Sequence, residues 1–185
     1  LALTEVDYGW DAASIQMRAE SSNNKYVLNG TKLFVHDIAA ATQLLCVVRT
    51  EGNDHSERGV TLLMVDMRSP GISIRLLSGF LGWVGEVNFN SVVVPRSAVL
   101  GEPGAGWESL QKAFKKAIPI FCAYKVGGAQ SVFDMSVDYS RERIQFGTPI
   151  GRFQRVQDHV IEIINQLDAA RWTTYEALWK LDNEH

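Results

Sequence analysis

The residues best suited to bind an anion are concentrated in one stretch, SRERIQFGTPIGRFQRVQ (140–157). It carries arginines and glutamines on either side of a Phe-Gly-Thr-Pro turn. Guanidinium forks and side-chain amides at a helix–loop–helix corner could hold a diphosphate. The same composition also fits a solvated, basic helix end that stops at Gly and Pro, and the residues alone leave both interpretations open. The side chains concerned are Arg141, Arg143, Arg152, Arg155, Gln145, Gln154 and Gln157.

No other stretch carries a self-sufficient catalytic or metal-binding pattern. His36, His55, His159 and His185 show no metal-ligand spacing such as HExxH, and the sequence has no CxxC, no Gly-x-Ser-x-Gly elbow and no P-loop. The GAG at 104–106 lacks the third glycine of a dinucleotide fingerprint, which favours a plain turn into a helix. The sequence therefore predicts no metal site and no catalytic residue of its own.

Composition is that of an ordinary globular protein and argues against several classes of partner. Of the 185 residues, 46% are hydrophobic and 21% charged, with a net charge of -3. A pI near 5.8 argues against nucleic acid, because phosphate binding needs a basic surface. No apolar run approaches the roughly 20 residues that cross a membrane. Cys46 and Cys122 lie in apolar runs, so we expect buried thiols and a reducing, cytoplasmic location.

Residues 12 to about 100 show the alternation and turn signals of β structure. Asn29-Gly30, inside an otherwise apolar stretch, predicts a type I′ hairpin turn. Short strands joined by hairpin-like turns predict an antiparallel barrel or sandwich as the first domain, residues 1–103. The expected strand segments are 15–20, 25–35, 43–49, 60–66, 71–77 and 86–94.

After residue 104 the apolar residues recur every three or four positions, which is the period of a helix. We expect one long helix beginning near Trp107, a loop at 145–151, and a second helix from about 152 to 182. The second helix is apolar well beyond one stripe, so two antiparallel helices cannot bury this surface between themselves. The predicted fold class is therefore α+β, with a second domain at 104–185 that forms half of a four-helix bundle.

Four stretches together resemble the acyl-CoA dehydrogenase family over nearly the whole chain. LTEVDYGWD (3–11) is similar to the family's LTEPxxGSD, and YVLNGTKLFVHD (26–37) to its YxLNGxKxWIT(N). VVVPRSAVLGEPGAGW (92–107) resembles the strand that ends in Val-Pro and leads to a Gly-x-Gly helix start. RERIQFGTPIGRFQRVQ (141–157) is close to ERxQFGxPIxxFQxxQ. All four occur in the family's order.

The resemblance implies a middle β-barrel and the first two helices of the C-terminal bundle. It further implies that an N-terminal helical domain and two more bundle helices lie outside these residues. Family members bind FAD and oxidise acyl-CoA: a glutamate removes the α-proton while the β-hydride passes to flavin N5. A minority carry that glutamate in the first bundle helix, just before an arginine. Ala117 and Ile118 stand at these two positions, so no catalytic base is expected here.

The resemblance also implies which residues contact the cofactor and the substrate. Thr4 keeps the family's residue, Phe34 replaces a tryptophan that lies against the flavin, and His36 replaces a hydrogen-bonding threonine. Trp10 replaces a serine of the cofactor and substrate region, and Val6 a proline of the same turn. The helical corner matches residues that reach the FAD of a neighbouring subunit. The implied FAD-binding set is Leu3, Thr4, Phe34, His36, Arg143, Gln145, Phe146 and Gln154, with Trp10 on the substrate side.

These observations support three hypotheses about function. The first is an FAD-dependent acyl-CoA dehydrogenase, an oxidoreductase of lipid metabolism, represented by a truncated or degenerate member. The second is a non-catalytic subunit derived from the family, which keeps only the half site facing a partner. The third is a flavin-free interaction module that dimerises through its helices. We expect the half bundle to be completed either by another part of a longer chain or by another subunit, and the expected assembly is a homodimer or heteromer formed through the helical half.

Overall fold

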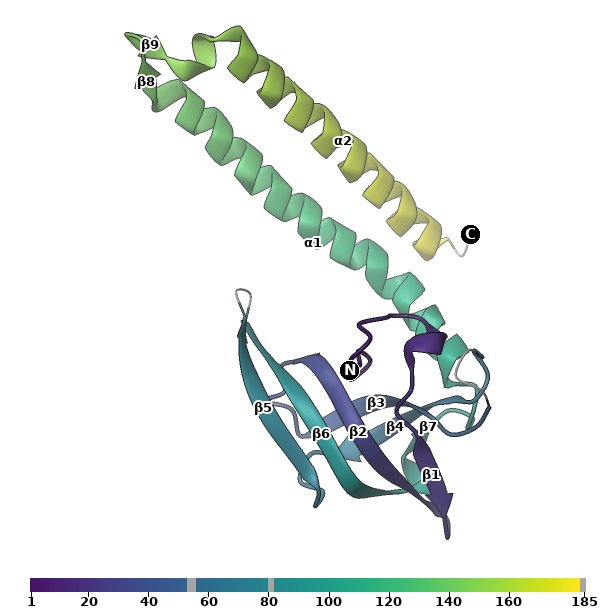
Figure 1. Ribbon diagram of the computed structural model, residues 1–185. Helices are drawn as coiled ribbons and strands as arrows, with labels where there is room; N and C mark the ends of the chain where they lie inside the picture. The colour runs from purple at the N-terminus through teal and green to yellow at the C-terminus, as the bar shows by residue number, and fades with distance from the viewer. Residues whose placement is uncertain (53–55, 80–81, 184–185) are drawn as a thin grey trace. The chain divides into compact units, whose positions relative to one another are not determined.

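The computed structural model describes residues 1–52, 56–79, 82–183, and the chain divides into two compact units, Leu1–Gln111 and Lys112–His185 (Figure 1). His55 and His185 lie outside the described residues.

The first unit consists of two antiparallel sheets (Figure 1). The larger sheet has the order β1-β2-β6-β5, and the smaller has the order β3-β4-β7. Short 3₁₀ turns at Ala12–Ser14 and Arg96–Ala98 flank them. The strands are β1 (Ala19–Ser22), β2 (Lys25–His36), β3 (Gln43–Arg49), β4 (Val60–Asp66), β5 (Ile72–Gly79), β6 (Gly82–Pro95) and β7 (Val99–Leu100).

The core of this unit is formed by apolar side chains from strands of both sheets. Leu28 of β2, Cys46 of β3, Leu63 of β4 and Val92 of β6 are fully buried members of one cluster. Along β2 and β6 buried positions largely alternate with exposed ones, as expected for strands with one face on a core. This confirms the antiparallel β part of the predicted fold class.

The predicted hairpin at Asn29-Gly30 is wrong, because β2 continues through it as one long strand. The register against β6 shifts between Leu28 and Gly30, which marks a β-bulge. Gly30 has φ +146°, outside the left-handed region that a type I′ turn requires, and the Asn29 carboxamide oxygen accepts a hydrogen bond from the Ser91 N–H (2.8 Å). The strand expected at 15–20 is also shorter than predicted, since β1 begins at Ala19.

The second unit is an antiparallel pair of long helices, as predicted (Figure 1). Helix α1 (Gly106–Glu142) starts in the first unit and runs through Pro119, and α2 (Gln154–Asp182) follows. They are joined by a tight hairpin of β8 (Ile144–Gln145) and β9 (Thr148–Pro149) and by a 3₁₀ turn. No helix in the described part of the chain is long and apolar enough to cross a membrane.

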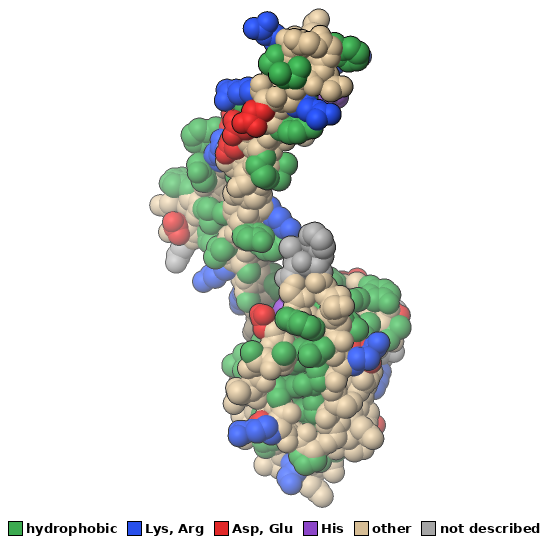
Figure 2. All heavy atoms as spheres, turned by 90° about the vertical axis from the view of Figure 1, so that its left-hand side faces the viewer, with side chains coloured by type: hydrophobic (Ala, Val, Ile, Leu, Met, Phe, Trp, Pro, Cys, Tyr) green, Lys and Arg blue, Asp and Glu red, His purple; other side chains and the backbone are tan. Residues whose placement is uncertain are grey.

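The two helices leave most of their apolar side chains exposed (Figure 2). Among the described residues of this unit, the buried side chains are Ser140, Leu167 and Thr174. Large residues such as Tyr124 and Trp172 are 67% and 68% exposed. The prediction that both cysteines are buried holds for Cys46 only, because Cys122 lies on an exposed face of α1. A helix pair that covers so little of its own apolar surface fits the predicted half bundle.

Candidate functional site

A pocket of about 370 Å³ lies beside the end of β2 in the first unit. Its walls come from the N-terminal segment, residues 1–10, and from the last residues of β2. Five residues that the sequence singled out meet there, although they are about 30 positions apart. The lining residues are Leu1, Leu3, Thr4, Tyr8, Trp10, Leu33, Phe34 and His36.

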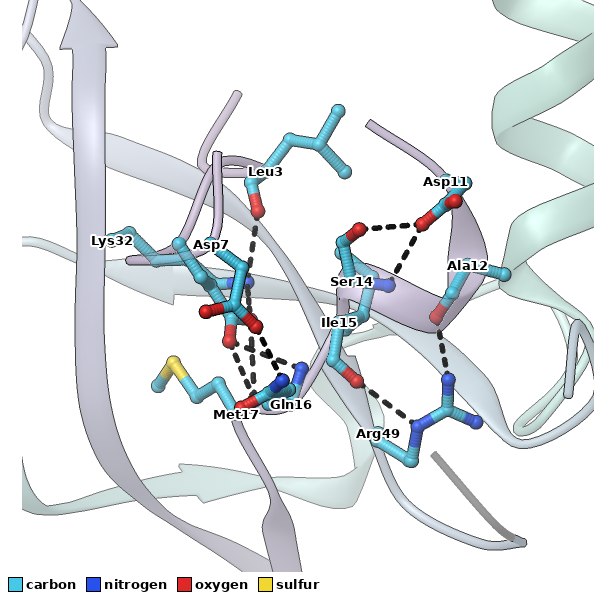
Figure 3. Close-up of polar contacts among 11 residues, drawn as sticks. Leu3, Asp7, Asp11, Ala12, Ser14, Ile15, Gln16, Met17, Lys32 and Arg49 are labelled. Atoms are coloured by element: carbon cyan, nitrogen blue, oxygen red, sulfur yellow. Dashed lines mark hydrogen bonds and ion pairs between the residues drawn. The ribbon is translucent and has the colours of Figure 1, made fainter. Parts of the chain in front are cut away.

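The N-terminal segment is held against β2 by a buried ion pair between Glu5 and Lys32. The Lys32 Nζ lies 2.6 Å from Glu5 Oε1. It also donates a hydrogen bond to the Leu3 carbonyl oxygen (3.2 Å), which is drawn in Figure 3. The Glu5 carboxylate accepts two further hydrogen bonds, from the N–H groups of Gln16 and Met17 (each 3.0 Å). Every charge in this network is compensated, which a buried pair requires.

The same contacts fix Leu3 and Thr4. The carbonyl oxygens of both residues accept hydrogen bonds from β2, that of Leu3 from Lys32 and that of Thr4 from the Leu33 N–H (2.8 Å). Leu3 is buried and Thr4 half-buried. The Thr4 backbone carbonyl is therefore already bonded, and its side-chain hydroxyl remains as a hydrogen-bonding group at the pocket.

Phe34 reaches the pocket because β2 carries a bulge between Lys32 and Val35, whereas the extra residue of the earlier register shift lies in β6. The register against β6 shifts between Lys32 and Val35, and Phe34 has φ +52°. An extra residue in one strand redirects its side chain. Phe34 is consequently 47% exposed, whereas Val35 is buried. The bulge thus directs the Phe34 ring away from the core and toward the pocket.

The other wall is shaped by the turn around Gly9. A Cβ atom at Gly9 would lie 1.7 Å from the Ser14 hydroxyl oxygen, so a side chain does not fit there. Asp11 caps the following 3₁₀ turn by accepting hydrogen bonds from the N–H and the hydroxyl of Ser14 (2.9 and 2.5 Å, Figure 3). These bonds hold the pKa of the Asp11 carboxyl below its usual value. Trp10, between the two features, is 71% exposed at the pocket.

A buried arginine ties this wall to the smaller sheet. Arg49 of β3 donates from Nε to the Ile15 carbonyl oxygen (3.0 Å) and from Nη2 to that of Ala12 (2.6 Å) (Figure 3). It is 1% exposed. Both sheets therefore contribute a buried cation that positions the segment before β1.

The other half of the predicted site lies on the hairpin between the two helices. Phe146 and Gly147 occupy its two turn positions with φ +53° and +77°, the geometry of a type I′ turn. Phe146 is 94% exposed and packs edge-on against Phe153 (centroids 6.1 Å apart). The loop expected at 145–151 is thus an ordered hairpin, because Gly147 and the strand pairs close it.

The polar residues of this corner are exposed and make local contacts. The Arg143 backbone N–H donates to the Tyr139 carbonyl oxygen (2.9 Å), and its own carbonyl accepts from the Ile150 N–H (2.8 Å). Gln145 donates from Nε2 to the carbonyl oxygen of Ile144 (2.8 Å). Gln154 is the first residue of α2 and is exposed. The backbone is therefore fixed, while Arg143, Gln145 and Gln154 present their side chains to solvent.

Two further expectations concern catalysis and metals. The first-helix base position, Ala117, and the following Ile118 are exposed on α1 and carry no ionisable group. In the described part of the chain, no cluster of His, Cys, Asp or Glu could hold a metal ion.

Sequence reasoning did not find Tyr8 or Lys32. Lys32 had a signal, since the alternation of Tyr26 and Leu28 along β2 places Lys32 on the buried side. Tyr8 had none, because its place beside Phe34 depends on the bulge in β2.

An antiparallel β unit followed by a pair of long helices is the architecture that the family resemblance implied, a middle β domain and the first two helices of a bundle. Residues 1–92 match the family model "Acyl-CoA dehydrogenase, middle domain" and residues 104–185 match "Acyl-CoA dehydrogenase, C-terminal domain". The chain belongs to the acyl-CoA dehydrogenase family.

Known relatives match almost all of the chain. The rat mitochondrial short/branched chain specific acyl-CoA dehydrogenase is 32% identical over 95% of this chain and 41% of that protein. The structure of a probable acyl-CoA dehydrogenase from Mycobacterium abscessus matches with a TM-score of 0.91 at 27% identity, covering 100% of this chain and 50% of its own. The FAD complex of PigA matches with a TM-score of 0.92 at 27% identity. The match covers 100% of this chain and 49% of the PigA chain. The chain thus spans about half the length of these proteins.

Proposed function

We propose that the protein is an FAD-dependent acyl-CoA dehydrogenase and that the pocket beside β2 receives its flavin ring. The proposal is supported chiefly by the convergence of Leu3, Thr4, Phe34 and His36 on one pocket. Bound FAD would supply the oxidant, since it accepts the β-hydride of an acyl-CoA thioester. Thr4 and His36 would donate hydrogen bonds to the ring, and Phe34 would lie against it. Trp10 would border the substrate.

The pocket suits such a ligand chemically. None of its described lining residues is acidic, and the nearest buried charges, Glu5 and Lys32, neutralise each other. Aromatic and aliphatic side chains with a few hydrogen-bonding groups match a flat, neutral ring that needs a few hydrogen bonds. In the helical unit, Arg143 would meet the diphosphate of the FAD of a neighbouring subunit, with Gln145, Phe146 and Gln154 along the rest of the cofactor.

A second candidate is a non-catalytic subunit that completes the flavin site of a partner. It is favoured by Ala117 and Ile118, which cannot act as a base or pair with an anion, and by the exposed Arg143 corner. In this case the protein would form a heteromer through its helical half. In both cases we propose a cytoplasmic protein that functions as an oligomer.

Titration with FAD, followed by anaerobic addition of acyl-CoA, separates the candidates. A dehydrogenase binds FAD, and its flavin absorbance bleaches when acyl-CoA is added. The second candidate binds FAD only when co-expressed with a companion chain. A protein that stays colourless with and without a companion, yet dimerises, contradicts both and supports the flavin-free module.

A further inference from the structure

Two aromatic residues of the pocket, Tyr8 and Phe34, adopt the same rare backbone conformation. Tyr8 has φ +56° and Phe34 has φ +52°. Bulky side chains seldom occupy this left-handed region, because it is sterically unfavourable for residues other than glycine. Strained residues of this kind cluster at functional sites. Here both strained residues line one pocket, although they come from separate segments of the chain.

Their rings contact each other. The centroids are 6.0 Å apart with the planes at 35°, within the range of favourable aromatic pairs. Core packing does not account for the pair, because Tyr8 is 63% and Phe34 47% exposed. An aromatic pair left half in water presents a surface to whatever enters the pocket.

The surrounding bonds maintain the strain at both positions. The Tyr8 N–H donates to the Glu5 carbonyl oxygen (3.0 Å) and closes the turn of residues 5–8. The Glu5 side chain is bound to Lys32, two residues before Phe34. The Leu33 N–H donates to the Thr4 carbonyl oxygen. The two rings are thus positioned by bonds that link the turn of residues 5–8 directly to the bulge of β2.

We propose that Tyr8 is a positioning residue for Phe34: its ring fixes the orientation of the Phe34 face that receives a flat ring. The inference rests on the proposed function, in which that ring is the flavin of FAD. Tyr8 acts through Phe34, so its contribution disappears when the Phe34 ring is absent. The Tyr8 hydroxyl is not required, because the contact is between rings.

A double-mutant cycle in FAD affinity tests this. Tyr8→Ala is expected to weaken FAD binding about two- to ten-fold, as expected for one aromatic pair, and to change the visible circular dichroism of bound FAD. Tyr8→Phe should bind as the wild type does. In a Phe34→Ala background, Tyr8→Ala should cause no further loss. Val6→Ala, an exposed residue of the same turn, is the control for disturbance of the turn.

Each result has a defined meaning. If the losses of Tyr8→Ala and Phe34→Ala add up, Tyr8 acts independently of Phe34 and the inference is wrong. If Tyr8→Ala binds FAD with the affinity of the wild type and with unchanged dichroism, the inference about Tyr8 is also wrong. The proposed function is not contradicted by that result, because the wild type still binds FAD. If wild-type protein does not bind FAD under any condition above, the proposed function fails first and this inference fails with it. Thermal unfolding of each variant shows whether it is folded.

Discussion

The pocket beside β2 and the hairpin between α1 and α2 differ in how their residues are positioned. Around the pocket, buried Glu5, Lys32 and Arg49 make hydrogen bonds that hold the N-terminal segment in place. At the hairpin, backbone bonds fix the chain, but Arg143 and Phe146 extend into solvent. The pocket is therefore preformed by this chain. The hairpin presents exposed side chains, and the binding role proposed for them requires a second surface or a ligand.

The largest expected effect follows from removing the cation of the buried pair. Lys32→Met should leave the Glu5 carboxylate buried without its partner and lower the free energy of unfolding by about 3–5 kcal/mol. Denaturant unfolding measures this. The control is Arg68→Ala, which removes an exposed pair with Asp66 (3.2 Å) and should leave stability unchanged. If both substitutions lowered the free energy of unfolding by similar amounts, the buried Glu5–Lys32 pair would not be what holds the pocket wall in place.

A substitution at the hairpin between α1 and α2 should change ligand affinity and not folding stability. Arg143→Ala should weaken any FAD binding about 10- to 100-fold through loss of a charge-assisted contact, with little change in thermal stability, because its side chain is exposed. Arg141→Ala is the matched control, since Arg141 faces Asp138 on the same helix (3.5 Å). Unchanged FAD affinity in Arg143→Ala would show that the role assigned to this corner is wrong.

Alkaline pH should affect the interior of the β unit. Burial raises the pKa of the Cys46 thiol from 9.0 to about 11. The folded state therefore keeps a proton that the unfolded state releases, so this contribution to stability is complete below pH 9 and is lost as the pH rises toward 11. The expected loss is of order 2 kcal/mol. Stability measured against pH in wild type and Cys46→Ala should diverge over this window; parallel curves would contradict the buried thiol.

The smallest effect is expected at the exposed edge of the pocket wall. Asp11→Ala should remove the cap on Ser14 and slightly lower the melting temperature. Because hydrogen bonds from Ser14 lower the Asp11 pKa, this contribution is present above the unfolded value of 3.8 and is lost as the pH falls through the lower folded value. Asp11→Asn, which keeps an acceptor oxygen, should retain more of the cap than Asp11→Ala. Melting curves at pH 7 and pH 3 compare the three proteins.

Much of the architecture could be predicted because it depends on local periodicity. The antiparallel strands and the helix pair follow from alternation and from apolar stripes at helical spacing. Asn29-Gly30 misled the prediction, since the same dipeptide serves a turn or a bulge, and only pairing with β6 decides which. Cys122 misled it for a related reason: an apolar neighbourhood in sequence does not provide a neighbour in space.

The sequence by itself determined the family motifs, the class of each element and the residue types that can contact a cofactor. Only the tertiary structure decided that Thr4, Trp10, Phe34 and His36 share one pocket, that Lys32 is buried against Glu5, and that the Tyr8 ring contacts the Phe34 ring. The physical reason is the distance along the chain over which each effect acts. Propensity and period act over a few neighbouring residues, whereas a bulge, a buried ion pair and a ring contact each depend on segments brought together by the whole sheet.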